Sequence, residues 1–442
     1  MAEFMRRLSL ALGFAACATA SHASNFGCVG LETQGDLPAI EGKDGVIFRI
    51  NADLRMYHPF SDATVRHLGA LSEALAEKGT TLVYVPIPTK SVTMPDYLPE
   101  RAPLYGFDLQ VATRVHTEIL TRLENAGVIA VDARDAMLKA PEGDLTFFKA
   151  DFHWSARGAM ETAKEIANVI QSQPSYAALE KTEYASHPLK SEVAFSGMRR
   201  ALQKKCKLAL PDPVTMTYET VALTSSDLGD AGLDLFGGGE DAIQVALLGT
   251  SFSDSPINNF PGFLAEYSQL EVINYAITGG NQFGAMTSYL TSEEFAQSRP
   301  KFLIWENPIY NNLAQYGDQP MRELIAAARG ECTKAISFEV SSDRRSLVAD
   351  LDQIDLTHDH TLFLDTDGSA GLRADFDFTS HDGLSRVKSI ERGERLRRTG
   401  RFYMPATGLW QTGATKVSIH LSEPFGPSPS LSLCPPQLKD NS

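Results

Sequence analysis

Apolar residues along the first three quarters of the chain fall into short runs separated by segments of helical periodicity. The run at 80–86 (TTLVYVP) follows a helix-like segment, 66–79, that ends at Gly79. Comparable runs occupy 243–248, 270–275 and 301–305. Such unbroken apolar runs are typical of buried parallel strands. The pattern predicts an α/β fold with a mainly parallel sheet flanked by helices, whose ligands bind at the carboxyl ends of the strands.

The pattern changes after about residue 330. Short, often alternating apolar runs are then broken by Gly, Asp and Pro, at 337–348, 360–365, 372–378, 401–404 and 415–421. This texture predicts a small C-terminal all-β, sandwich-like domain. With 442 residues, the chain is too long for one ordinary core. The expected domains are therefore residues 24–330 and 331–442.

The N-terminus has the features of a secretory signal peptide. Arg6 and Arg7 precede an apolar run at 8–18, and small residues follow up to Ala23. We expect cleavage after Ala23 and export of the mature chain; a loose lipid-attachment motif ending at Cys17 is the alternative. The four cysteines beyond this segment suit two disulfides, for which sequence allows three connectivities. Pairing Cys28 with Cys206 and Cys332 with Cys434 would close one domain each, and no spacing indicates a metal site.

Charge is unevenly distributed along the chain. The formal net charge is −15, which disfavours nucleic acid as a partner. Residues 384–403 (LSRVKSIERGERLRRTGRFY) nevertheless carry seven Lys or Arg against two Glu. The run is either a solvated face of a helix or ribbon, or a surface for an anionic ligand.

A serine follows one of the expected strands in 243–256 (IQVALLGTSFSDSP). Gly249 ends the strand and Ser251 lies on the turn that follows. A serine at the carboxyl edge of a parallel sheet can act as a nucleophile, with backbone N–H groups available to an oxyanion. The alternative is that Thr250, Ser251 or Ser253 only caps the next helix.

An acid and an imidazole lie two residues apart in 149–159 (KADFHWSARGA). Asp151 and His153 would supply the base that a serine nucleophile needs and the carboxylate that orients it. The alternative is an ordinary loop before a helix that Ser155 caps. Together with Ser251 on an α/β scaffold, the pair favours a Ser-His-Asp constellation.

Four segments resemble the SGNH-hydrolase-like acetyltransferases of bacterial exopolysaccharide export, in particular those that acetylate alginate. They are EGKDGVIFRI at 41–50, DFHWS at 151–155, GTSFSD at 249–254 and PKFLIWENP at 300–308. The acid-histidine motif precedes the serine here, which is the reverse of ordinary SGNH esterases. The resemblance implies a catalytic domain and a carbohydrate-binding module, each with a disulfide.

The resemblance also implies roles for individual residues. Ser251 would be the nucleophile that forms an acetyl-serine, His153 the general base and Asp151 the orienting carboxylate. The Ser251 N–H would share the oxyanion with further donors, for which the candidates are Gly280, Asn307 and Tyr310. Arg386, Lys388 and Trp410 are candidates for contacts to the glycan, since arginine pairs with carboxylates and tryptophan stacks on sugar rings.

The function implied is O-acetylation of alginate or another polyuronate in the periplasm. The resemblance implies no soluble cofactor and a donor passed on by membrane partners of the acetylation machinery. A monomer is expected. Two alternatives stay open, an exported SGNH-type carbohydrate esterase and a non-catalytic polysaccharide-binding scaffold.

Overall fold

The computed structural model describes residues 24–223, 243–354, 356 and 360–436. Its N-terminal part is built on a five-stranded sheet in the order β4-β3-β9-β7-β8, and every neighbouring pair in it is parallel. The strands are β3 (Thr81–Ile87), β4 (Ile129–Ala130), β7 (Val245–Leu248), β8 (Val272–Asn274) and β9 (Phe302–Pro308). The four apolar runs in the sequence thus correspond to β3, β7, β8 and β9, and the predicted α/β fold is confirmed. The signal segment, including Cys17, lies outside the described residues.

Side chains of the sheet alternate between two separate apolar clusters. Along β3, Leu82 and Tyr84 belong to one cluster and Val83 and Val85 to the other. Helices cover both faces because strands buried on both sides must be shielded from water. The first face packs on α2 (Asp62–Ala76), α10 (Gly284–Leu290) and α12 (Gln319–Arg329), and the second on α5 (Ala133–Leu138), α6 (Ala156–Gln171) and α9 (Phe260–Ser268).

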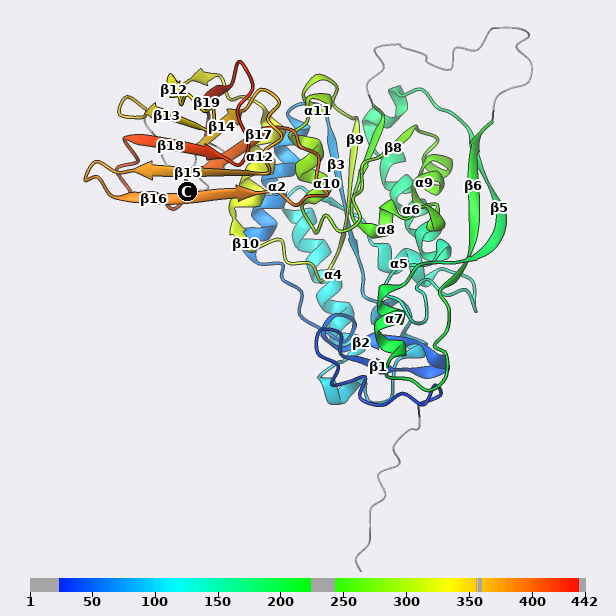
Figure 1. Cartoon of the computed structure of the whole chain (residues 1–442). Helices are drawn as coiled ribbons and strands as arrows, with labels where there is room; N and C mark the ends of the chain where they lie inside the picture. Colours follow the sequence, from blue (N-terminus) through cyan, green and yellow to red (C-terminus); the bar gives the residue numbers. More distant parts are fainter. Residues whose placement is uncertain (1–23, 224–242, 355, 357–359, 437–442) are drawn as a thin grey trace, which may run out of the picture.

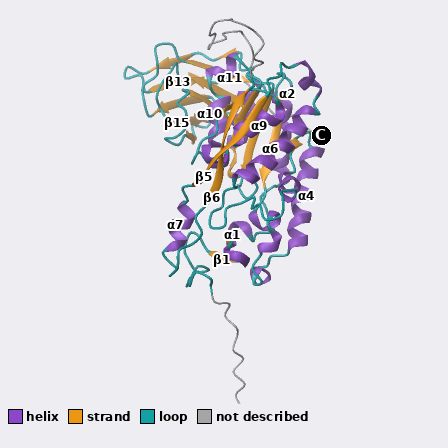
Figure 2. Cartoon of the chain, turned by 90° about the vertical axis from the view of Figure 1, so that its right-hand side faces the viewer, coloured by secondary structure: helices purple, strands orange, loops and turns teal. Residues whose placement is uncertain are grey.

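Shorter elements surround this sandwich. An antiparallel pair, β1 (Ala39–Glu41) and β2 (Ile47–Arg49), lies below the sheet in Figure 1. A long antiparallel pair of strands, β5 (Tyr184–Val193) and β6 (Val214–Ala222), which the sequence patterns did not predict, lies beside α6 and α9. The two strands form a separate sheet, which overlaps the central sheet in the view of Figure 2. The remaining elements of this part are α1 (Ile50–Asp53), α3 (Lys90–Thr93), α4 (Leu109–Asn125), α7 (Gly197–Gln203), α8 (Ser251–Asp254), α11 (Glu293–Gln297) and β10 (Gln315–Asp318).

The C-terminal part consists of two antiparallel sheets around a core of its own. One sheet has the order β12-β13-β18-β15-β16 and the other β11-β19-β14-β17. Their strands are β11 (Lys334–Ala335), β12 (Phe338–Val340), β13 (Ser346–Asp350), β14 (Thr361–Asp365), β15 (Arg373–Thr379), β16 (Ser385–Glu391), β17 (Arg401–Pro405), β18 (Lys416–Leu421) and β19 (Ser430–Cys434). The predicted second, all-β domain is confirmed. Patterning did not identify β16 and β19, because β16 is largely exposed and β19 follows a Pro- and Ser-rich segment.

Both expected disulfides are present, Cys28–Cys206 and Cys332–Cys434. The second joins the segment after α12 to the end of β19. Among the described residues, no helix is long and apolar enough to cross a membrane. Two disulfides indicate that the protein folds in an oxidising compartment.

The two parts of the chain share a packed joint. Tyr403 and Cys434 are buried in the same apolar cluster as α12. The Arg392 guanidinium donates to Glu323 Oε1 at 2.7 Å, and both side chains are less than a tenth exposed. Glu323 Oε1 also accepts from the Tyr403 N–H at 3.2 Å. The C-terminal part is therefore attached to α12 by apolar packing and a buried ion pair.

Candidate active site

Asp151, His153 and Ser251 form a hydrogen-bonded series. His153 Nδ1 lies 2.6 Å from Asp151 Oδ1, and His153 Nε2 lies 2.7 Å from Ser251 Oγ. The Asp151 side chain is buried, whereas the imidazole is 20% exposed. A base between a serine hydroxyl and a buried carboxylate can accept the serine proton while the carboxylate stabilises the resulting imidazolium.

Ser251 follows β7 directly, on a turn whose geometry depends on glycine. A Cβ at Gly249 would lie 2.4 Å from Glu306 Oε2 and 2.9 Å from Ser253 Oγ, too close for any side chain. Thr250 is the N-cap of the single-turn helix α8, and its hydroxyl accepts from the Phe252 N–H. The helix-capping alternative thus holds for Thr250, while Ser251 is left facing His153.

Glu306, in the WENP segment of β9, holds this turn in place through hydrogen bonds. Its carboxylate accepts from the Thr250 N–H at 2.7 Å, from the Thr250 hydroxyl at 3.1 Å and from the Ser253 hydroxyl at 2.9 Å. The side chain is wholly buried, and burial raises its pKa to about 7 although these donors act in the opposite direction. The sequence of the WENP segment alone does not indicate this role of Glu306.

The loop that carries Asp151 and His153 is held between α6 and the nucleophile turn. Ser155 caps α6, as predicted, by accepting from the Gly158 N–H. The fully buried Trp154 donates its indole N–H to the Phe252 carbonyl at 2.9 Å, which ties this loop to α8. The Phe152 and Phe252 rings lie 4.1 and 4.9 Å from the imidazole. Both motifs therefore reach the site as parts of one packed unit.

Burial raises the pKa of Asp151, but the hydrogen bond and charge of His153 outweigh it, and the net pKa is lowered. A hydrogen bond from Ser196 acts in the same direction. The carboxyl is thus held ionised, as the acceptor of the His153 N–H must be. Nothing in the sequence around Ser196 pointed to this contact.

Arg49, in the EGKDGVIFRI segment, lies at the edge of the site. Its guanidinium is stacked between the rings of Phe152 and Tyr310, at 4.8 and 4.6 Å, and pairs with the buried Asp53 at 2.8 Å. Arg49 and then Phe152, whose ring contacts the imidazole, therefore lie between Tyr310 and His153. Burial raises the pKa of the Tyr310 hydroxyl, which keeps it a proton donor.

The other two oxyanion candidates have partners elsewhere. The Gly280 N–H donates to the Ile277 carbonyl at 3.0 Å. The amide of Asn307 is fully buried and donates to the Tyr84 hydroxyl at 3.0 Å. The loop that contains Gly280 does reach the nucleophile turn, because the Thr278 N–H donates to Asp254 Oδ2 at 2.8 Å.

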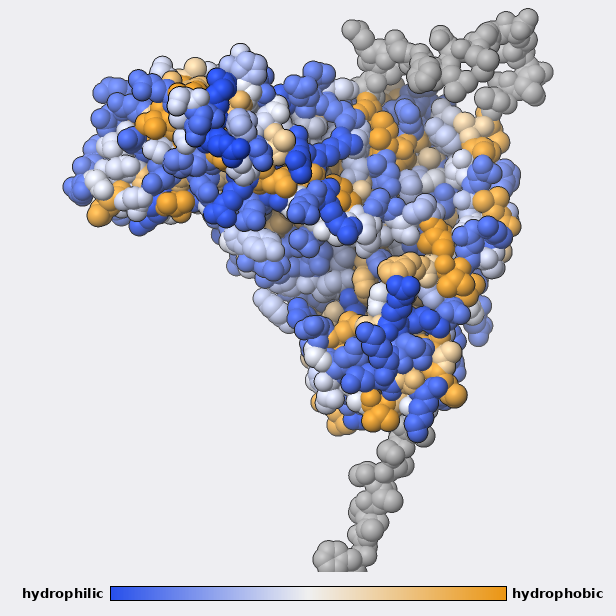
Figure 3. All heavy atoms as spheres, viewed as in Figure 1, coloured by the Kyte–Doolittle hydropathy of each residue, from blue (hydrophilic) through white to orange (hydrophobic). Residues whose placement is uncertain are grey.

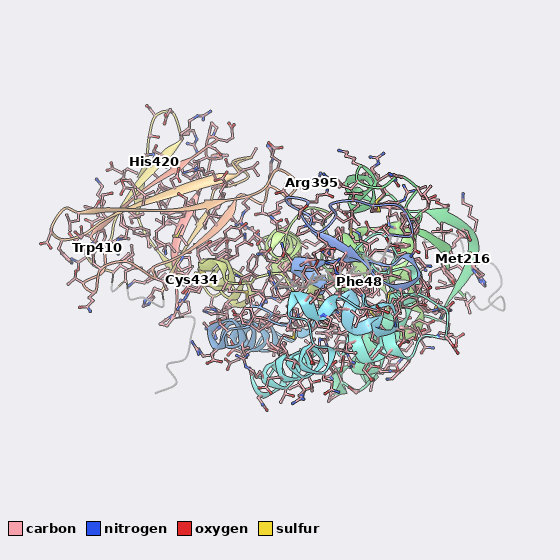
Figure 4. The ribbon with its side chains drawn as sticks, turned by 90° about the horizontal axis from the view of Figure 1, so that it is seen from below. Phe48, Met216, Arg395, Trp410, His420 and Cys434 are labelled. Carbon is pink, nitrogen blue, oxygen red and sulfur yellow. A yellow bond between two sulfur atoms is a disulfide. The ribbon has the colours of Figure 1, made fainter. Side chains whose placement is uncertain are left out.

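The basic run at 384–403 forms β16, a crossing loop and β17. Most of its cations contact the protein itself: Arg392 pairs with Glu323, Arg397 with Glu294, and Arg401 with Glu293 and Asp365, while Arg395 donates to the Thr278 carbonyl and Arg398 to the Ala370 carbonyl. Neither simple alternative, solvated face or ligand surface, describes it, since much of the run builds the joint between the two parts. In Figure 4 Arg395 lies at this joint.

The glycan candidates lie at the far end of the C-terminal part, where Figure 4 places Trp410. The Arg386 guanidinium stacks on the Trp410 ring at 4.9 Å. Lys388 donates to the Pro405 and Thr407 carbonyls, and burial lowers its pKa to about 8. The structure thus groups these three residues with one another and away from Ser251. Among the described residues, no cluster of His, Cys, Asp or Glu could hold a metal ion.

A parallel sheet with Ser, His and Asp hydrogen-bonded in series at its carboxyl edge defines an α/β protein of the serine-hydrolase type. Residues 39–309 match the family described as "SGNH hydrolase-like domain, acetyltransferase AlgX", and the chain belongs to this family. The alginate biosynthesis protein AlgX of Pseudomonas aeruginosa is 32% identical over 276 residues, which are 62% of this chain and 56% of that protein. AlgX of Azotobacter vinelandii is 31% identical over 291 residues, 65% of this chain and 58% of that protein.

Solved structures show the same fold. The structure of Pseudomonas aeruginosa AlgX aligns with a TM-score of 0.75 at 24% identity and covers 90% of this chain and 94% of its own. The O-acetyltransferase domain of Pseudomonas putida AlgJ aligns with a TM-score of 0.51 at 21% identity, over 65% of this chain and 98% of that domain. The first likeness extends through both parts of the chain, whereas sequence similarity spans little more than half of the curated relatives.

Proposed function

We propose that the protein transfers acetyl groups to hydroxyls of alginate in the periplasm. The observation that carries this proposal is the series Asp151–His153–Ser251 on the fold of an acetyltransferase family whose named relatives take part in alginate biosynthesis. The two disulfides support an exported location. The acetyl donor reaches the site from membrane partners of the acetylation machinery.

In the proposed reaction, Ser251 Oγ attacks the acetyl carbonyl of the donor as His153 Nε2 takes its proton. The Ser251 N–H and the Tyr310 hydroxyl donate to the oxyanion. Collapse forms acetyl-serine and releases the donor alcohol, which takes the proton from His153. A sugar hydroxyl then attacks the acetyl-serine as His153 takes its proton; His153 returns that proton to the departing Ser251 Oγ, which frees the acetylated sugar and regenerates the enzyme.

Arg386 and Trp410 are the proposed glycan contacts in the C-terminal part. A guanidinium stacked on an indole presents a cation and a flat ring side by side, which suits a uronate carboxylate and the sugar ring that carries it. Lys388 supports this surface by ordering the backbone at Pro405 and Thr407.

The test uses the purified protein, an acyl-ester donor and polymannuronate oligomers, with products analysed by mass spectrometry. Wild type and the control Ser172→Ala, at the far end of α6, should add acetyl groups to the oligomers. Ser251→Ala and His153→Gln should not. Acetate release without acetylated oligomer would make the protein an esterase. Equal amounts of acetylated oligomer from wild type and Ser251→Ala would refute the serine mechanism, and no product from wild type would leave the protein a binding scaffold.

A further inference from the structure

Lys90, the first residue of α3, places a charged group in the interior next to the site. Its side chain is 1% exposed. The ammonium donates to the carbonyls of Asp151 at 2.6 Å, Phe148 at 2.8 Å, Ile47 at 2.9 Å and Lys149 at 3.3 Å. An ammonium has three N–H groups, so all of them are used and one is shared. The backbone before His153 is thus folded around a buried cation.

These bonds join three separate segments of the chain. Ile47 belongs to β2, and its own N–H donates to the Lys149 carbonyl at 2.7 Å. Lys90 follows β3, which pairs with β9, the middle strand of the parallel sheet. The Lys90 ammonium therefore links the segment after β3 to the β1–β2 pair and to the loop at 148–151. The conformation of the peptide that carries Asp151 depends on that contact.

Ser196 holds the carboxylate of Asp151 from the other side. Its hydroxyl donates to Asp151 Oδ2 at 2.5 Å and accepts from the Arg199 N–H at 2.9 Å as the N-cap of α7. Asp151 Oδ1 accepts from the backbone N–H and the ring of His153. Because both carboxylate oxygens have donors, the carboxylate cannot rotate without losing one of them.

We propose that Lys90 and Ser196 are positioning residues for the acid-base pair: Lys90 fixes the backbone of the loop, and Ser196 fixes the rotation of the Asp151 carboxylate. The inference rests on the proposed Ser251 chemistry. Neither residue touches the reacting atoms, so both act through Asp151. A carboxylate held at this angle keeps His153 Nε2 aimed at Ser251 Oγ, and small displacements there cost rate.

The charges around Lys90 agree with this role. Asp53 on α1 and Asp151 favour its charged form, whereas Arg49 on β2 opposes it. Burial, the largest effect, lowers the pKa of Lys90 to about 8. The ammonium lies among two carboxylates and four carbonyls, which an apolar side chain could not replace.

Ser196 variants give the first test, with hydrolysis of p-nitrophenyl acetate as the assay. Ser196→Ala should lower kcat about tenfold or more, as expected for a bond to a charged group, with little change in KM. The hydrogen bond from Ser196 helps to lower the pKa of Asp151, so its loss should raise that pKa and move the acid limb of the kcat/KM profile to higher pH. Ser196→Thr keeps the hydroxyl and should restore both properties.

Ser292→Ala is the matched control, because Ser292 caps α11 but makes no bond to the site. It should leave kcat and the acid limb unchanged. A Ser196→Ala variant that loses thermal stability while its kcat and acid limb stay at wild-type values would overturn the assignment of Ser196.

Lys90→Met gives the second test, and kcat should fall about 100-fold. Its control is Lys181→Met, which removes a lysine that also donates to two carbonyls, those of Tyr176 and Leu179, away from the site. An unchanged kcat in Lys90→Met would overturn the role of Lys90. If this variant does not fold, the wild-type protein is titrated instead and followed by proton NMR. The signal of the downfield proton between His153 and Asp151 should weaken as Lys90 loses its proton. A signal that persists through that titration would overturn the role of Lys90.

The same NMR signal separates this inference from the proposed function. Ser196→Ala should shift or lose the downfield proton whatever reaction the protein catalyses. If Ser251→Ala retains activity but the proton responds to Ser196, the proposed function fails and the positioning stands. A proton that is the same in wild type and Ser196→Ala refutes the positioning even when Ser251→Ala is inactive.

Discussion

Glu306 allows a prediction that links the nucleophile turn to pH-dependent stability. In Glu306→Gln the amide oxygen can replace Oε2, which accepts from the Thr250 N–H and the Ser253 hydroxyl, and the amide nitrogen can face the Thr250 hydroxyl. The shape of the site is therefore kept while its titratable group is removed. Any pH dependence that disappears with the substitution belongs to Glu306.

The sign follows from the pKa of the folded protein, which burial raises to about 7 from the ordinary 4.5. Below pH 4.5 the carboxyl is protonated in both the folded and the unfolded protein, so its ionisation does not change the free energy of unfolding. As the pH rises toward 7, the unfolded chain ionises freely while the folded one does not, so stability is lost. At about 1.4 kcal/mol for each pH unit, the loss is about 3 kcal/mol, complete just above pH 7.

The assay is urea unfolding of wild type and Glu306→Gln at several pH values between 4 and 8. The difference in the free energy of unfolding, wild type minus variant, should fall by about 3 kcal/mol across this range. A difference that stays flat would mean that the three donors offset the burial completely. A difference that grows with pH would refute the argument that burial dominates.

Three further predictions concern the contribution of single contacts to stability. Arg392→Met leaves Glu323 buried without its partner and should lower the free energy of unfolding by about 3–5 kcal/mol in urea titrations; a loss below about 1 kcal/mol would show that the joint does not depend on this pair. Replacing Cys332 and Cys434 by serine opens a bridge between positions 102 residues apart, and calorimetry should show a loss of about 4 kcal/mol; an unchanged Tm would contradict it. Trp154→Phe removes the bond to the Phe252 carbonyl and should cost about 1–3 kcal/mol, together with a lower rate of p-nitrophenyl acetate hydrolysis; loss of stability alone would show that Trp154 does not align Ser251.

Periodicity was sufficient to predict the fold because the decisive strands are short apolar runs buried on both faces. The β5–β6 pair was not predicted, for the opposite reason. Its strands are largely exposed, and Leu189, Val193 and Val214 face solvent, which gives no clean alternation. Some of its apolar residues are visible on the surface in Figure 3.

The part of the candidate site that lies in short sequence motifs could be predicted. Asp151 and His153 share one motif and Ser251 another; Ser251 follows the parallel strand β7, and the loop before α6 brings Asp151 and His153 to it. Lys90 and Ser196 could not be predicted, because their partners are a backbone carbonyl and a carboxylate 61 and 45 residues away. Sequence patterns carry no record of such pairings.

The basic run shows how composition alone can misdirect. Seven cations in an acidic chain predicted either a ligand surface or a solvated face, yet Arg392, Arg397 and Arg401 pair with carboxylates within the protein. A local excess of charge does not reveal whether its counter-charges lie in a ligand or in a distant helix.

The joint at α12 determines how parts of this protein could be exchanged with those of its relatives. Glu323 precedes residue 330, where sequence texture alone would place the cut, but its partners Arg392 and Tyr403 follow it. A chimera joined after Gly330 would therefore separate Glu323 from both of its partners. A donor segment that begins ahead of α12, at about Gln315, would carry both halves of the contact together.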